Sequence, residues 1–295
     1  MIFYKIRPCQ KIGKTGYFMS FSKKKTKFVY KTDGCFSLER TLECGQCFRF
    51  EKKDESTYRV IASGLSRDIT QHGDEVAFHG TSDEEFADFW YDYFDFSRDY
   101  TRCDKILCTD SRLKAASVYA RGIHILRQDP WETLISFIIS QNNNIPRIKG
   151  IITRLCALCG DRINDEGDFS FPSPQRLNVL YPDDLAPLRA GFRVKYIMDA
   201  TEKIASGDID LLKTASLSTD EARNRLMLIK GVGCKVADCT MLYGMGKIDA
   251  FPKDVWIKRA MNALFPDGLP SEFSPIAGIA QQYLFHYIRN SGESF

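Results

Sequence analysis

The sequence predicts an α+β protein, with an N-terminal antiparallel β-sheet domain followed by an all-helical domain. Short runs rich in Val, Tyr, Phe and Thr, punctuated by Gly, Asp and Ser, are typical of strands and occur between about residues 27 and 80. Beyond about residue 112 these signals fade, and apolar residues recur at helical spacing between helix start and stop signals. The 295 residues suit about two domains. We therefore expect a basic tail over residues 1–26, a β-rich domain over 27–112 and a helical domain over 113–295.

The β-rich domain should contain several antiparallel strands and one aromatic helix. The expected strands are KFVYKT, CFRFEK, TYRVIASG and EVAFHG, which start at Lys27, Cys47, Thr57 and Glu75. Ser82 and Glu85 then have the spacing of a capping box, which opens a helix. Aromatic residues recur in that helix every three or four positions, so we expect them in the core rather than on a stacking surface.

Capping signals define the helices of the second domain. Asp129 followed by Pro130 starts a buried helix over WETLISFIIS. Asn144 caps the next helix, which should run to Cys159 and stop at Gly160. The later helices are expected from a capping box at Ser218 and Glu221 to near Lys230, from about Cys234 to Tyr243, over VWIKRAMNALF, and from about Ile276 to Asn290.

The charge of the chain is unevenly distributed. Residues 1–32 contain nine Lys or Arg and no Asp or Glu, whereas the rest has 32 basic and 38 acidic residues, a net charge of −6. A basic tail favours an acidic polymer such as nucleic acid, but the globular part carries no such electrostatic signal.

No targeting or membrane segment is expected. The chain has no run of 18 or more apolar residues, so we predict no membrane-spanning helix and no membrane partner. Charges interrupt every apolar stretch of MIFYKIRPCQKIGKTG, which argues against a signal peptide. Ten cysteines without a signal peptide favour reduced thiols and a cytoplasmic location.

Two cysteine pairs have the CxxC spacing found in some metal sites. Cys44 and Cys47 are far in sequence from Cys156 and Cys159, and the second pair lies in an apolar helix pattern. We therefore interpret all four as small buried residues and predict no metal site; zinc binding is the alternative.

The segment LMLIKGVGCKVADCTMLYG carries the strongest functional signal. Two helices flank a short turn that contains Gly231 and Gly233, and glycine allows the backbone to approach a partner closely. The second helix begins with free N–H groups and a positive dipole end, which suit a phosphate oxygen. The pattern predicts a DNA-binding helix-hairpin-helix; a tight helix connection without that function is the alternative.

Two ionisable residues near this turn are candidates for chemistry. Lys235 lies in the first turn of the second helix, where the helix dipole disfavours a cation and favours a nucleophilic amine. Cys239 follows four residues later on the same face and suits the wall of a pocket for a flat ring. Asp254 in DAFPKDVWIKRA is a carboxylate at a helix start that could stabilise positive charge at a sugar carbon. The alternatives are a solvated lysine and an ordinary helix cap.

These residues resemble a known family. GVGCKVADC followed by FPKDVW looks like the helix-hairpin-helix glycosylase superfamily, which carries a lysine in the hairpin and an aspartate about twenty residues later. The segments GIHILRQDPWETLISFIISQNNNIPRIKGIITRLC, AGFRVKYI, SPIAGIAQQYLF and LECGQCFRF are similar, in order, to the 8-oxoguanine DNA glycosylases, and the match covers roughly residues 27 to 290. The resemblance is to a bacterial member similar to the eukaryotic enzymes, and it implies that the β-rich domain is TATA-binding-protein-like and that LECGQCFRF forms a base-pocket strand.

The resemblance implies a bifunctional base excision repair enzyme. Lys235 would attack the deoxyribose C1′, displace 8-oxoguanine and form a Schiff base that leads to strand cleavage by β-elimination. Asp254 would stabilise the oxocarbenium-like transition state. The base would be recognised by the carbonyl of Gly45, which accepts the N7–H of 8-oxoguanine, by Gln281, and by the sandwiching side chains of Cys239 and Phe285. No cofactor is implied, although a structural cation could bind the hairpin carbonyls.

The resemblance also implies residues that hold the rest of the duplex. Asn142, Arg147 and Arg193 would hold the orphaned cytosine, and Phe192 would fill the emptied stack. Trp256 departs from the eukaryotic histidine that contacts phosphate, and Lys230 replaces a proline often found before the hairpin glycines. The implied partner is double-stranded DNA that contains 8-oxoguanine opposite cytosine, bound by a monomer at the bacterial nucleoid.

Three other functions compete with this interpretation. Endonuclease III and adenine glycosylases use four cysteines near the C-terminus for an iron–sulfur cluster, and no cysteine follows Cys239 here. Glycosylases for alkylated bases share the aspartate but lack the lysine. A non-catalytic helix-hairpin-helix module needs neither Lys235 nor Asp254, nor the three residues Gly45, Gln281 and Phe285.

Overall fold

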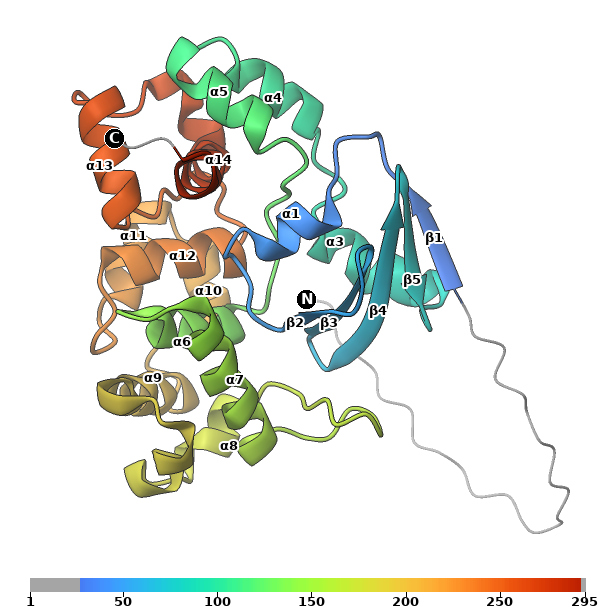
Figure 1. Ribbon diagram of the computed structural model, residues 1–295. Helices are drawn as coiled ribbons and strands as arrows, with labels where there is room; N and C mark the ends of the chain where they lie inside the picture. Colours follow the sequence, from blue (N-terminus) through green and yellow to red (C-terminus); the bar gives the residue numbers. More distant parts are fainter. Residues whose placement is uncertain (1–26, 293–295) are drawn as a thin grey trace, which may run out of the picture.

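The structure, a computed structural model, describes residues 27–292, in which a five-stranded antiparallel sheet is joined to a group of helices (Figure 1). The basic tail predicted over residues 1–26 lies outside the described residues. The α+β fold class predicted from the sequence is confirmed, because the strands occupy the N-terminal part and the helices follow.

The sheet is built entirely from antiparallel neighbours. Its strands are ordered β1-β5-β4-β3-β2 and comprise β1 (Lys27–Lys31), β2 (Phe50–Lys52), β3 (Thr57–Ala62), β4 (Leu65–His72) and β5 (Glu75–His79). Four of these strands were expected, and β2 is shorter than predicted because it begins at Phe50 rather than Cys47. Strand β4 was missed.

The aromatic helix covers the sheet as predicted. Ser82 caps it by accepting a hydrogen bond from the backbone N–H of Glu85, and it proceeds through α2 (Asp83–Glu85), a π-helical turn (Phe86–Trp90) and α3 (Tyr91–Tyr93). Phe86, Trp90 and Phe94 are buried against the sheet residue Phe78. These rings form a separate core cluster beneath the sheet, so their helical spacing reflects packing.

Four helices begin at the capping residues that were predicted from the sequence. Asp129, Asn144, Ser218 and Asp254 each accept a hydrogen bond from a backbone N–H in the first turn of the following helix. The helices are α1 (Leu38–Glu43), α4 (Tyr100–Leu107), α5 (Ser111–Tyr119), α6 (Pro130–Ser140), α7 (Ile145–Cys159), α8 (Pro174–Asn178), α9 (Val194–Ala205), α10 (Leu211–Ser216), α11 (Thr219–Leu226), α12 (Cys234–Gly244), α13 (Val255–Leu264) and α14 (Ala277–Asn290), with 3-10 turns at Pro182–Leu188, Gly191–Arg193 and Ser271–Ile276. Helix α11 ends at Leu226, four residues before the predicted end.

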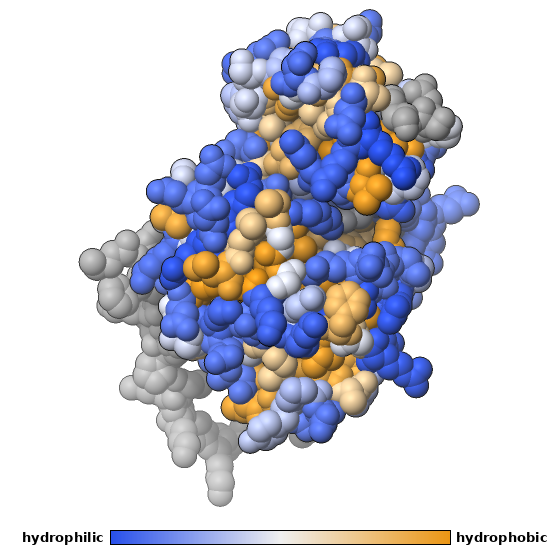
Figure 2. Space-filling view, turned by 90° about the vertical axis from the view of Figure 1, so that its left-hand side faces the viewer, coloured by the Kyte–Doolittle hydropathy of each residue, from blue (hydrophilic) through white to orange (hydrophobic). Residues whose placement is uncertain are grey.

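A second, larger core lies among these helices. Helix α6 is buried on nearly all sides and packs against α12, while α14 packs against α5 and α13. Helix α1 lies between the sheet and the helices (Figure 1). Figure 2 shows the side of the molecule that lies on the left in Figure 1, where apolar patches interrupt a hydrophilic exterior.

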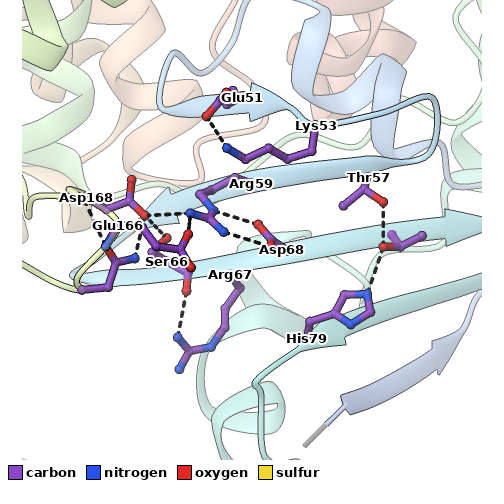
Figure 3. A network of polar contacts seen from close by, with 12 residues as sticks. Glu51, Lys53, Thr57, Arg59, Ser66, Arg67, Asp68, His79, Glu166 and Asp168 are labelled. Atoms are coloured by element: carbon purple, nitrogen blue, oxygen red, sulfur yellow. Dashed lines mark hydrogen bonds and ion pairs between the residues drawn. The ribbon is translucent and has the colours of Figure 1, made fainter. Parts of the chain in front are cut away.

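A polar network connects the sheet to the loop that follows α7 (Figure 3). Arg59 of β3 binds Asp68 of β4 through two hydrogen bonds of 2.7 and 2.9 Å, and it also pairs with Glu166 and Asp168 of the loop. Ser66 donates a further hydrogen bond of 2.6 Å to Asp168. The loop is thereby fixed to the open face of the sheet.

Candidate active site

The helix-hairpin-helix predicted from the two glycines is present in α11, α12 and the turn between them. Gly231 has φ +81°, and a Cβ atom there would lie 2.4 Å from the ring of Tyr196, so only glycine fits. Gly233 is the exposed N-cap of α12 and provides no side chain to satisfy the first N–H groups of that helix. An ion pair of 2.7 Å between Arg223 and Asp238 joins the two helices. The N-terminus of α12 therefore suits an anionic oxygen.

Lys235 lies in the first turn of α12, between that helix and α6. Its amine is 3.4 Å from the hydroxyl oxygen of Ser140, the last residue of α6. It also lies 4.9 Å from the centre of the Phe137 ring, one turn earlier in α6. The side chain is partly buried, so the amine is held by two helices and remains open on one side.

Asp254 both caps α13 and faces the same region. One of its carboxylate oxygens accepts a hydrogen bond of 2.8 Å from the backbone N–H of Ile257, which fixes the side chain at the start of the helix. The cap proposed as the ordinary interpretation is thus real. It leaves the carboxylate rigid, which is what a role in stabilising charge requires.

Cys239 lies one helical turn beyond Lys235 on α12, and its thiol is 3% exposed. Burial raises the pKa of this thiol to about 11; the charge of Lys235 acts to lower the pKa, and the charges of Asp238 and Asp254 act to raise it. Lys235 and Cys239 are thus neighbours on one helix, and Asp254 is near enough for its charge to act on the thiol.

Gly45 lies opposite α14, in a turn rather than on a strand. The prediction of a base-pocket strand is wrong at this position, because Gly45 follows α1 and has φ +89°, a conformation that strands do not adopt. A Cβ atom at Gly45 would lie 3.6 Å from the Phe285 ring of α14. The turn at Gly45 thus lies next to the Phe285 side chain of α14.

Gln281 lies one turn before Phe285 on the same helix, as the spacing predicted. Its side chain is 4% exposed, and its carbonyl oxygen has no hydrogen-bond partner within residues 27–292. An unsatisfied buried acceptor costs roughly 1–3 kcal/mol, so such an atom is normally satisfied by a water, an ion or a ligand that donates to it. A ligand with an N–H group, lying beside Phe285, would satisfy it.

Four further predicted residues gather at the end of α6. Asn142 has φ +51° and is exposed in the loop between α6 and α7, and Arg147 is exposed in the first turn of α7. Phe192 is 47% exposed, with the guanidinium carbon of Arg193 4.5 Å from its ring centre. This group forms an exposed rim with one aromatic side chain available to a partner.

Arg193 supports this rim from within. It is 2% exposed and donates hydrogen bonds to the backbone carbonyls of Gln141, Asn142 and Ala190. Burial lowers the pKa of its guanidinium, and the positive charge of Arg147 lowers it further. In this structure Arg193 therefore holds the loop that carries Asn142.

Several residues of the site were not found from the sequence. Ser140 and Phe137 contact Lys235, and Tyr243 and Gln282 lie behind the pocket. For Gln282 a signal existed, because two adjacent glutamines in the apolar run AGIAQQYLF are unusual in a buried helix. Ser140 and Phe137 carry no such signal, since their role arises only when α6 meets α12.

The cysteine pairs are buried, as predicted. Cys44, Cys47, Cys156 and Cys159 are each at most 5% exposed, and within residues 27–292 no group of three or more His, Cys, Asp or Glu residues could hold a metal ion. A search of the same residues finds no helix both long and apolar enough to cross a membrane.

Two protein-family models match the chain. The model for the 8-oxoguanine DNA glycosylase N-terminal domain matches residues 28–134. The model for the HhH-GPD superfamily of base excision DNA repair proteins matches residues 135–269. Together they cover the sheet, Lys235 and Asp254, and they end before α14, which carries Gln281 and Phe285.

Known proteins with similar sequence or structure agree with these matches. A probable N-glycosylase/DNA lyase of Methanothermobacter thermautotrophicus is 33% identical over 215 residues, which is 62% of this chain and 69% of that protein. The MBOgg1 protein in complex with a low affinity DNA ligand superposes with a TM-score of 0.85 at 43% identity, over 92% of this chain and 98% of its own. The 8-oxoguanine glycosylase/lyase of Clostridium acetobutylicum, in complex with double-stranded DNA containing cytosine opposite 8-oxoguanine, has a TM-score of 0.84 at 36% identity, over 90% and 99%.

Proposed function

Because the chain belongs to the 8-oxoguanine DNA glycosylase family, we propose that it excises 8-oxoguanine opposite cytosine from duplex DNA and cleaves the strand at the resulting abasic site. It is a bifunctional N-glycosylase and DNA lyase of base excision repair. We propose that it acts as a monomer, since one chain supplies every residue of the candidate site.

The buried acceptor of Gln281 is the observation that carries the assignment of the pocket. It lies one helical turn from Phe285, which faces the turn of Gly45. A purine between these residues would place its Watson–Crick N–H groups near Gln281. Its N7–H, which 8-oxoguanine has and guanine lacks, would donate to the carbonyl of Gly45. One hydrogen bond would then separate the lesion from the normal base.

We assign the chemical steps to Lys235 and Asp254. The amine of Lys235 attacks C1′ of the flipped deoxyribose, and the electron pair of the glycosidic bond leaves with the base, which takes up a proton. Positive charge that develops on the sugar is stabilised by the Asp254 carboxylate. The nitrogen then gives up a proton, the C1′–O4′ bond breaks, O4′ takes up a proton, and a protonated Schiff base forms at C1′. Loss of a proton from C2′ then breaks the C3′–O bond and expels the 3′ phosphate.

This chemistry requires neither a metal nor an organic cofactor, because the amine is the nucleophile and the protonated Schiff base that it forms is the electron sink. A cation on the carbonyls of the hairpin turn would only stiffen that turn. The N-terminus of α12 with Gly231 and Gly233 would hold a phosphate of the damaged strand.

The exposed rim would contact the rest of the duplex. We propose that Phe192 enters the space left by the flipped base, and that Asn142, Arg147 and Arg193 hold the unpaired cytosine. Flipping costs a few kcal/mol, which these contacts offset. Arg193 donates a hydrogen bond to the backbone carbonyl of Asn142 and so holds the loop that carries it. Its proposed role is to keep that loop in place and to donate its remaining N–H to the cytosine.

Borohydride trapping tests the proposal directly. A duplex with one 8-oxoguanine opposite cytosine should form a covalent adduct with the wild-type protein, and an unmodified duplex should not, because only a Schiff base is reduced to a stable bond. Lys235→Gln should abolish the adduct and retain binding of the lesion duplex. Lys230→Gln, which removes the neighbouring amine of the hairpin, should still give the adduct.

Three results of this experiment would each contradict a different part of the proposal. Trapping by Lys235→Gln would show that another amine is the nucleophile. Base release without an adduct would keep the glycosylase and remove the covalent role of Lys235. Absence of both would indicate a different lesion or a non-catalytic DNA-binding module.

A further inference from the structure

Two buried side chains connect the turn at Gly45 to the helix that carries Lys235. The side-chain amide nitrogen of Gln282 in α14 donates a hydrogen bond of 3.2 Å to the backbone carbonyl of Cys44. The hydroxyl of Tyr243 in α12 donates a hydrogen bond of 2.5 Å to the side-chain oxygen of Gln282. Gln282 is 1% exposed and Tyr243 is 4% exposed, so water does not compete for either bond.

The first bond bears directly on the orientation of Gly45. The carbonyl of Cys44 belongs to the peptide bond between Cys44 and Gly45, and a peptide unit is planar, so fixing its oxygen fixes the plane that enters Gly45. Glycine itself imposes little restriction on the following dihedral angles. The orientation of the Gly45 carbonyl must therefore come from bonds to its neighbours.

The far side of the same turn is held in a similar way. The side-chain oxygen of Gln46 accepts a hydrogen bond of 2.9 Å from the backbone N–H of Leu126, and its backbone carbonyl accepts one of 2.8 Å from the Gln128 side chain. Gln46 is fully buried. Gly45 thus lies between two anchored peptide units, one of which depends on Gln282.

Tyr243 has a fixed position relative to Lys235. Both lie on α12, eight residues apart, and Cys239 lies midway on the same face. The ring of Tyr243 stacks on Phe137 with centroids 5.5 Å apart and planes at 19°, and Phe137 is also the ring beside the amine of Lys235. The amine of Lys235 therefore belongs to the same rigid unit as the hydroxyl of Tyr243, which is the first member of the hydrogen-bonded link to the peptide before Gly45.

We propose that Tyr243 and Gln282 are positioning residues, which set the place of the base-recognising carbonyl of Gly45 relative to the attacking amine of Lys235. This inference rests on the proposed function. Neither side chain contacts the base in this arrangement; they act through the peptide before Gly45. A purely structural role would instead be to satisfy each other in the core, with equal effects on every activity.

Two activities of one protein distinguish these roles. Excision of 8-oxoguanine needs the base to be recognised, whereas cleavage at a preformed abasic site needs only the amine and the sugar. Tyr243→Phe and Gln282→Leu should each lower single-turnover excision about ten-fold, because a misplacement of about 1 Å costs up to about 10²-fold in rate. Cleavage of a preformed abasic duplex should stay within about two-fold of wild type.

Tyr283→Phe is the matched control. It also removes a buried tyrosine hydroxyl from this region, one that donates to the carbonyl of Ile123 and makes no bond to the peptide between Cys44 and Gly45. Its ratio of excision to abasic-site cleavage should equal that of the wild type, whatever its effect on stability.

Each outcome decides between the roles. Equal losses in both activities, or no change in their ratio, would overturn the positioning role. If Gln282→Leu does not fold, Tyr243→Phe alone decides, since it removes a single oxygen atom. A wild-type protein that leaves 8-oxoguanine in place would refute the proposed function and this inference with it, whereas wild-type excision with an unchanged ratio in both variants refutes the inference alone.

Discussion

Some residues of the candidate site stabilise the fold in addition to their proposed role in DNA repair. Asp254 caps α13, and Arg193 donates to three backbone carbonyls. Truncating either residue would therefore remove a helix cap or a loop anchor together with any function, at a cost of about 1–2 kcal/mol or more. Gly45 and Lys235 are better probes, because neither holds another element in place.

Gly45→Ala should weaken recognition of the lesion. The added methyl group would point at the Phe285 ring, 3.6 Å away, and would strain a backbone at φ +89° by about 1–2 kcal/mol. We expect excision of 8-oxoguanine to fall at least about ten-fold and the preference over guanine to shrink. Competition between lesion and undamaged duplexes measures that preference, and an unchanged preference would contradict the role of the Gly45 carbonyl.

At the scale of helices and turns, the shape of the hairpin between α11 and α12 depends most on one residue, Gly231. Tyr196 of α9 packs its ring face directly against Gly231, so the turn is shaped by a third helix as well as by its own sequence. The hairpin is therefore pre-formed for a phosphate, with no ordering needed on binding.

Gly231→Ala should destabilise this element strongly. The new Cβ would lie 2.4 Å from the Tyr196 ring at φ +81°, and overpacking with backbone strain costs roughly 2–4 kcal/mol in total. Thermal unfolding should show a drop of several degrees in Tm, and affinity for damaged and undamaged duplexes should fall alike. Gly233→Ala, where the Cβ meets open space, is the stability control; an equal Tm drop in both would exclude the contact with Tyr196 as the cause.

Four helices that begin at capping side chains were predicted from the sequence, whereas α4, α5, α8 and α10, which also have capping side chains, were not named individually. The helices after Asp129, Asn144, Ser218 and Asp254 begin at side chains that cap them, which is a property of adjacent residues. Strand β4 has the sequence LSRDITQH, in which Ile69 is its only buried residue, so no alternating apolar pattern reveals it. Helix α1 has six residues, too few for a periodic pattern.

The same distinction applies to the site. Lys235, Cys239 and Asp254 belong to a motif readable along the chain, and so do Gln281 and Phe285. The contact of Gln282 with Cys44 joins residues 238 positions apart, and the contact of Ser140 with Lys235 joins residues 95 apart. Such pairs arise from packing between helices, which no local pattern of this sequence expresses.

At the scale of the whole molecule, Arg59 joins the sheet to the helical part. It is 14% exposed and is surrounded by the carboxylates of Asp68, Glu166 and Asp168. The Arg59 guanidinium also lowers the pKa of Asp68. Because the loop after α7 bears Glu166 and Asp168, the Arg59 guanidinium attaches this loop to the sheet (Figure 3).

Arg59→Leu should therefore loosen that loop and lower the stability of the protein. Removing the cation leaves half-buried carboxylates facing one another, which costs about 1–3 kcal/mol after discounting for solvent at the exposed partners. Urea unfolding measures the loss, and limited proteolysis should cut between residues 161 and 169. Lys213→Leu, which removes an exposed ion pair with Asp210 on α10, should change neither readout; equal effects would show that Arg59 has no special part.

The residues proposed to recognise the base and the residues proposed to act on the sugar come largely from different segments of the chain. Under the proposed function, the turn at Gly45 and helix α14 would face the ring of the base, whereas Lys235 of α12 and Asp254 before α13 would act at the sugar. A mutation in the turn or in α14 could then alter which base is accepted and leave the amine and carboxylate in place. Selection could diversify the lesions that such a scaffold removes while conserving the strand-cutting step, except through α12, where Cys239 and Tyr243 share a helix with Lys235.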